Sequence, residues 1–148
     1  MSIFLKRSAR VMAAYLISVS LAYVLASIAA TQFVLSQLAS LGYSVTVSQR
    51  LLTLTHDVLG MAPFYGVILL VTLGIAFSVA SFISSYIPRF RAAGLIGGSA
   101  IAVVFVHLIM QRLFSLSPLY SAGDLVGLIT QGFAGGVGGF FYYLMRRT

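Results

Sequence analysis

Four long apolar segments dominate the pattern of hydrophobic and polar positions along the chain. They cover residues 11–35, 62–87, 92–114 and 124–145, and the only charged residues inside them, Arg112 and Asp124, stand at outer ends. A membrane-spanning helix needs roughly 20 apolar residues, and each segment supplies them. Backbone groups inside a bilayer must be hydrogen-bonded within their own segment, and the short alternating segments of a β-barrel are absent. The pattern predicts an all-α fold, a four-helix transmembrane bundle formed by one integral membrane domain over residues 1–148.

The first segment does not end cleanly, because Gln32, Ser36 and Ser40 recur at every fourth position while the opposite side stays apolar. We therefore expect this helix to continue beyond the bilayer or to tilt strongly, and to stop at Gly42. A short extended stretch, "YSVTV", follows.

An amphipathic stretch then precedes the second span. At 100° per residue its polar residues share one arc, and its leucines and a valine share the other. The polar arc holds Gln49, Arg50, Thr53, His56 and Asp57, and the apolar arc holds Leu51, Leu52, Leu54, Val58 and Leu59. Ser48 is the expected N-cap, Gly60 the stop, and Pro63 the first turn of the next helix. These features predict a short amphipathic helical cap over about residues 36–60, on the outer side of the membrane.

Composition supports the membrane interpretation. The chain is 60% hydrophobic and 7% charged, with a mean hydropathy of +1.06, whereas about a quarter of the residues of soluble domains are charged. The net charge of +7 would suit nucleic-acid binding, but the basic residues flank apolar segments, which is typical of membrane orientation. We expect a lipid bilayer as the surroundings and no nucleic-acid partner.

The basic residues also predict an orientation. Seven basic residues lie on one side of the membrane in the predicted topology: Lys6, Arg7, Arg10, Arg89, Arg91, Arg146 and Arg147. The other side receives Arg50, Arg112, Asp57 and Asp124. The positive-inside rule then places both termini in the cytoplasm, in a multi-pass protein of the cytoplasmic (inner) membrane. A cleaved signal peptide is the alternative for the first segment, but its apolar run exceeds the usual 7–15 residues, so we favour a retained span.

Glycine pairs spaced four apart suggest helix contacts in the last two spans. Small residues allow helix backbones to approach closely in lipid. The residues concerned are Gly94, Gly98, Gly132, Gly135, Gly136 and Gly139. Packing inside the bundle is the favoured interpretation. A subunit interface is the second, and an unwound segment lining a cavity is the third.

Polar residues gather at one depth in the outer half of the predicted bundle. Counted from the cytoplasmic ends, this layer contains Tyr23, Tyr65, His107, Gln111, Thr130 and Gln131. Such groups are costly in lipid, so they face protein or a cavity. We prefer a structural interhelical hydrogen bond, for example between His107 and Gln131. The alternative is a small pocket that opens outward and binds a headgroup, quinone or substrate.

Residues for catalysis or metal binding are scarce. The chain has no cysteine and no carboxylate in the middle of a span. Its strong metal ligands are His56, His107, Asp57 and Asp124, and no short motif brings them together. Haem held by His56 and His107 would need the two rings to face each other. We expect no enzyme, no cofactor and no metal, and we interpret Arg50, His56 and Asp57 as the polar face of the outer cap.

The leading functional hypothesis is therefore a non-enzymatic accessory or scaffold component of a membrane assembly. Its expected partners are copies of itself or other membrane-protein subunits, with contacts made through glycine-rich helix faces or through the cap. A small transporter, or a carrier of lipid or quinone that uses the outer polar layer, is the main alternative. A haem-dependent redox protein ranks last.

Overall fold

A computed structural model of the chain describes residues 2–114 and 125–147, and these residues are almost entirely helical. Helix α1 covers Ser2–Ser40 and α2 covers Val47–Gly60. A π-helical turn, Ala62–Gly66, leads directly into α3, Val67–Tyr86. A 3-10 turn, Pro88–Phe90, leads into α4, Arg91–Phe114, and α5 covers Leu125–Arg147.

Four of these helical segments are long and apolar enough to cross a membrane, as predicted. They are Leu5–Ser40, Ala62–Tyr86, Pro88–Met110 and Leu125–Arg146. They indicate a multi-pass membrane protein. Asp124, the predicted start of the last span, lies outside the described residues.

The first helix is longer than predicted. Its 39 residues amount to about 58 Å at a rise of about 1.5 Å per residue, nearly twice a hydrocarbon core of roughly 30 Å. Residues 36–40, assigned above to the cap, belong to this helix. The helix ends at the predicted place, because Gly42 has a φ of 89°, a left-handed conformation that glycine adopts without strain.

The N-cap of α2 is Thr46 and not Ser48. The Thr46 Oγ1 accepts the Gln49 N–H at 3.3 Å, and the Gln49 Oε1 accepts the Thr46 N–H at 2.9 Å. This reciprocal pair is a capping box, which satisfies two backbone donors at once and so outcompetes a lone serine two residues later. Helix α2 ends at Gly60, and Pro63 lies in the first turn of the next helix.

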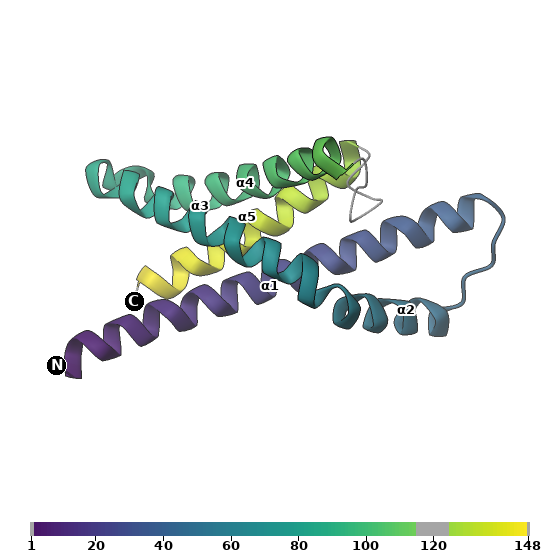
Figure 1. Ribbon diagram of the computed structural model, residues 1–148, viewed down its shortest axis with the longest axis horizontal. Helices are drawn as coiled ribbons and strands as arrows, with labels where there is room; N and C mark the ends of the chain where they lie inside the picture. Colours follow the sequence, from purple (N-terminus) through teal and green to yellow (C-terminus); the bar gives the residue numbers. More distant parts are fainter. Residues whose placement is uncertain (1, 115–124, 148) are drawn as a thin grey trace.

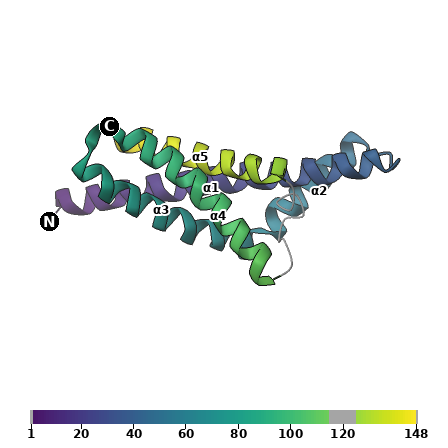
Figure 2. The ribbon, with the colours of Figure 1, turned by 90° about the horizontal axis from the view of Figure 1, so that it is seen from above.

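Helix α5 lies between α1 and α4, and α3 packs against α4. Figures 1 and 2 show both chain ends and the α3–α4 turn at one end of the bundle. The α1–α2 hairpin extends at the opposite end (Figure 1). The chain ends and the α3–α4 turn therefore lie opposite the hairpin along the long axis of the bundle.

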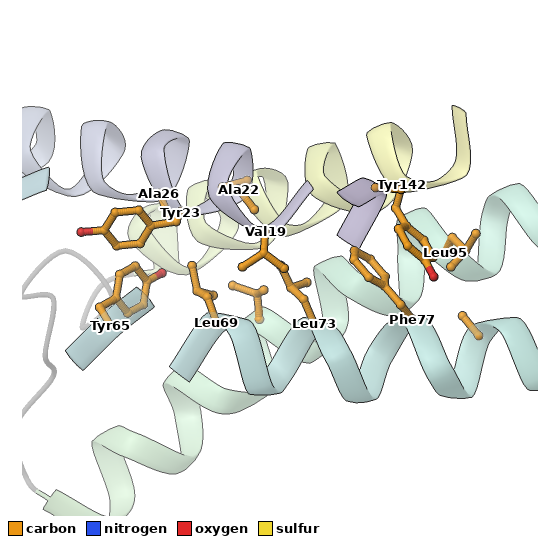
Figure 3. Packing of buried hydrophobic residues seen from close by; sticks show 14 of the residues in the cluster. Val19, Ala22, Tyr23, Ala26, Tyr65, Leu69, Leu73, Phe77, Leu95 and Tyr142 are labelled. Atoms are coloured by element: carbon orange, nitrogen blue, oxygen red, sulfur yellow. The ribbon is translucent and has the colours of Figure 1, made fainter. Parts of the chain in front are cut away.

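The core combines small side chains of α1 with large ones of α3 and α5. Ala22 and Ala26 are fully buried beside Leu69 and Leu73 (Figure 3). Phe77 and Tyr142 stack with ring centroids 4.2 Å apart. Alanine on one helix lets the larger side chains of its neighbours fill the space between them, so dispersion contacts hold the bundle together in lipid.

Candidate functional site

Two hydrogen bonds join three helices in the half of the bundle nearer the hairpin. The Tyr65 hydroxyl donates to the Gln131 Oε1 at 2.9 Å. The Gln131 Nε2 donates to the Ala26 carbonyl at 3.1 Å. Tyr65 and Gln131 are 2% and 0% exposed, so the pair is sealed from the surroundings. Tyr65 belongs to the π-helical turn before α3, and this local widening of the helix aims its ring at α1 and α5 (Figure 3).

His107 lies beside this pair but is not hydrogen-bonded to it. Its ring is 1% exposed and meets the Tyr65 ring edge-on, with centroids 5.6 Å apart. Its Nδ1 is 2.7 Å from the Val103 carbonyl, which can only accept, so Nδ1 carries the proton. Its Nε2 has no partner among the described residues. The predicted His107–Gln131 hydrogen bond is therefore not formed.

The structure separates the remaining members of the predicted polar layer. The Tyr23 hydroxyl donates to the Val58 carbonyl of α2 at 2.6 Å, and its ring lies 5.9 Å from that of Tyr65. Thr130 is exposed, and its hydroxyl donates to the Gly127 carbonyl of its own helix at 2.8 Å. The Gln111 side chain lies outside the described residues. Tyr23, Tyr65, His107 and Gln131 therefore form one cluster, which Thr130 does not join.

Two further polar contacts fix how α2 lies along α1. The Arg50 guanidinium donates to the Gln32 Oε1 at 3.0 Å, and the Thr31 hydroxyl donates to the Asp57 Oδ2 at 2.9 Å. His56 points away, with an 88% exposed side chain whose Nδ1 is 4.0 Å from the Asp57 Oδ1. An exposed pair at this distance contributes little stability.

This attachment half-buries Leu54 and Val58 and leaves the rest of the apolar arc of α2 uncovered. Leu51, Leu52 and Leu59 are 60%, 69% and 71% exposed. Hydrophobicity alone would turn these leucines inward. Arg50 and Asp57 instead contact polar side chains of α1. The three leucines lie on the other side of α2 and therefore face outward.

The glycines of α5 are packed against α4. A methyl group at Gly135 would lie 2.7 Å from Val103 Cγ2 and 2.8 Å from the Ser99 carbonyl oxygen. One at Gly139 would overlap the Leu95 carbonyl and the Ser99 hydroxyl, and Gly132 and Gly136 contact the same face of α4. Gly138, which no GxxxG pair singled out, packs against α1, because a methyl group there would lie 2.9 Å from Ala22 Cβ.

Gly94 and Gly98 behave differently, because neither packs against α5. A methyl group at Gly98 would meet nothing within 4 Å, and one at Gly94 would meet only the Ser84 hydroxyl, at 4.0 Å. Both line an apolar groove of about 660 Å³ between α3 and α4. One wall runs from Thr72 to Ile87 and the other from Gly94 to Ile109. Sequence periodicity had not revealed this groove, since it shows only which residues share a face.

No three residues of the types His, Cys, Asp and Glu come together as a metal site within residues 2–114 and 125–147. His56 is exposed on α2 while His107 is buried in α4, so the two rings do not face each other. The arrangement offers hydrogen bonding, apolar contact and one unpartnered imidazole nitrogen.

No protein-family model matches the chain, and comparisons with curated proteins and with solved structures give no match either.

Proposed function

We propose that this chain is a non-enzymatic accessory or scaffold component of a membrane assembly. We further propose that the exposed leucine face of α2 contacts the partner, which is either another membrane-protein subunit or a copy of the same chain. The observation that carries this proposal is that Leu51, Leu52 and Leu59 are exposed while the opposite side of α2 is held on α1 by polar contacts.

The position of this face supports a protein partner. Counting about 20 residues for the hydrocarbon core from Val11, the core ends near Ala30. Gln32, and Arg50 beside it, then lie beyond the hydrocarbon, and Leu51 and Leu52 lie beyond it with them. Leucines there are not surrounded by lipid tails. Covering each one is worth about 1.5–3 kcal/mol, which favours a docked apolar surface.

The proposed orientation places both termini in the cytoplasm and the hairpin outside, in the cytoplasmic (inner) membrane. Support comes from the seven Lys and Arg residues near the two termini and the α3–α4 turn, all at one end of the bundle (Figures 1 and 2). Fusions of alkaline phosphatase or a fluorescent protein to the C-terminus test this. Phosphatase activity without fluorescence would place the C-terminus outside the cytoplasm and contradict the proposed orientation.

Mass spectrometry of the complex extracted in mild detergent tests the function. The wild-type chain should carry a protein subunit in fixed stoichiometry. The triple substitution Leu51→Ser, Leu52→Ser and Leu59→Ser should release that subunit and leave the helix content unchanged. His56→Ser, a change at an exposed polar residue of the same helix, should retain it. A wild-type chain extracted without any protein subunit would refute the proposal.

A carrier that binds lipid or quinone near His107 is the second candidate. The unpartnered Nε2 of His107 favours it, because a buried nitrogen without a hydrogen bond is costly and a ligand would satisfy it. The closed Tyr65–Gln131 pair beside it argues against an open pocket. Ligand binding that is unchanged in His107→Leu would exclude this candidate.

Haem-dependent redox chemistry ranks last, and an absorbance band near the Soret region in the purified protein would revive it.

A further inference from the structure

The groove between α3 and α4 has the dimensions of a single lipid chain. Its α3 wall, from Thr72 to Ile87, extends over about 22 Å, which exceeds one leaflet of a hydrocarbon core of roughly 30 Å. Its volume of about 660 Å³ lies within the range of ligand-binding clefts. The Ser84 hydroxyl, one of the few polar groups on its wall, donates to the Ala80 carbonyl at 2.5 Å. The wall therefore presents hydrocarbon.

One end of the groove carries positive charge. Ile87 and Phe90 line this end and flank Arg89 in the chain. The Arg89 guanidinium carbon lies 4.8 Å from the centroid of the Phe90 ring. Arg91 follows at the start of α4 and is partly buried. The one ion pair among the described residues joins His56 to Asp57, so neither arginine is neutralised by a carboxylate there.

This charge favours a lipid over a protein helix as the occupant. By the positive-inside rule, a neighbouring transmembrane helix carries its own Lys and Arg at the membrane face where Arg89 and Arg91 lie. A second copy of this chain in the same orientation would bring the same two arginines. Either helix would be repelled at this end. An anionic phospholipid has the complementary charge there, because its phosphate lies at headgroup depth directly above its acyl chain.

We propose that the α3–α4 groove binds an acyl chain of an anionic phospholipid and that Arg89 and Arg91 hold its headgroup phosphate. This inference concerns a different face from the leucine face of α2, and either proposal can fail without the other. Each arginine near an anionic headgroup is worth about 5.5-fold in affinity, so the two together should favour an anionic over a zwitterionic lipid by about thirtyfold.

Native mass spectrometry of the full chain, stripped of lipid in detergent, tests the proposal. Phosphatidylglycerol and phosphatidylcholine with identical acyl chains are titrated separately. The wild-type chain should bind phosphatidylglycerol about thirtyfold more tightly. The double variant Arg89→Gln and Arg91→Gln should bind both lipids equally. Arg112→Gln removes an exposed arginine from the last turn of the same helix and should keep the full preference.

A second pair of variants tests the groove itself. Gly98→Leu places a side chain in the groove and should weaken binding of both lipids by about tenfold, the effect of losing about two buried methylene groups. Gly97→Leu is the matched control, since a side chain there also meets nothing within 4 Å but Gly97 does not line the groove. Both substitutions favour the helical state, so loss of folding is not expected.

Three results would overturn the proposal. The first is equal wild-type affinity for the two lipids. The second is an unchanged preference in the double arginine variant. The third is a disulfide-linked dimer formed in membranes by Ile101→Cys, which would put a second copy in the groove. Because the chain contains no cysteine, such a link would report this position alone.

Discussion

Glycines spaced four apart occur at both faces of α4, but one face is closely packed and the other is open. On one face α5 approaches so closely that a methyl group at Gly135 or Gly139 would collide with backbone carbonyls of α4. On the other face Gly94 and Gly98 border an open groove beside α3. The difference shows that a glycine pair in a membrane helix indicates the possibility of close approach. Whether a neighbour uses it depends on the shape of that neighbour.

The closed face should give the largest response to substitution. Gly139→Ala forces a methyl group onto the Leu95 carbonyl and the Ser99 hydroxyl, and backbone cannot move aside as a flexible side chain can. We expect a loss of about 2–3 kcal/mol in the free energy of unfolding, the upper part of the range for overpacking. Unfolding in detergent with increasing dodecyl sulfate, followed by circular dichroism, measures it. A loss below about 0.5 kcal/mol would mean that α5 does not approach α4 as described.

The hydrogen bonds near the hairpin end of the bundle should give an intermediate response. Tyr65→Phe removes the donor to Gln131 while the Gln131–Ala26 bond remains. Interhelical hydrogen bonds in membrane bundles average about 0.6 kcal/mol, and leaving Gln131 Oε1 unpaired adds to that, so we expect a loss of about 1 kcal/mol.

Tyr43→Phe is the matched control, because Tyr43 lies outside the bundle and is largely exposed. It should leave the free energy of unfolding unchanged in the same titration. Equal losses in both variants would show that the Tyr65 hydroxyl contributes nothing through Gln131.

The open face should respond least, and with the opposite sign. Gly98→Ala adds a methyl group where nothing lies within 4 Å, and alanine forms helix more readily than glycine. The substitution should therefore raise the free energy of unfolding by about 0.5–1 kcal/mol. A clear loss of stability in the same assay would indicate that α3 or a bound neighbour closes on Gly98.

Much of the fold could be predicted because hydropathy and turn chemistry are local properties. Four apolar helices, the glycine end of α1 and the stop of α2 at Gly60 follow from single segments of the chain. Which helix face meets which neighbour is not local. In lipid an exposed leucine costs little, so hydrophobicity does not separate the inside from the outside of a bundle. The free faces of Gly94 and Gly98 could not be deduced for this reason. The rotation of α2 depends on its polar contacts with Thr31 and Gln32, which lie far from it in the sequence.

Only part of the candidate site could be predicted, because the sequence gives the depth of a residue along its helix but not the direction in which it faces. Counting along helices at a fixed rise brought Tyr65, His107 and Gln131 to one depth, and the structure places them together. Depth does not give rotation about the helix axis, so Thr130 was included although it faces away. The partner of Gln131 depends on the π-helical turn before α3, which turns Tyr65 toward it. No periodicity in the sequence signals that turn.

Fluorescence quenching by brominated lipid most directly tests whether the open face of α4 holds an anionic lipid. The chain has no tryptophan, so Ile101→Trp gives a single reporter in the groove. Ile17→Trp, an exposed position on α1 outside the groove, is the control. We expect brominated phosphatidylglycerol to quench the Ile101→Trp reporter more strongly than brominated phosphatidylcholine at equal mole fraction. The Ile17→Trp reporter should show no such difference. Equal quenching of the Ile101→Trp reporter by the two lipids, or the same preference at both positions, would contradict the account.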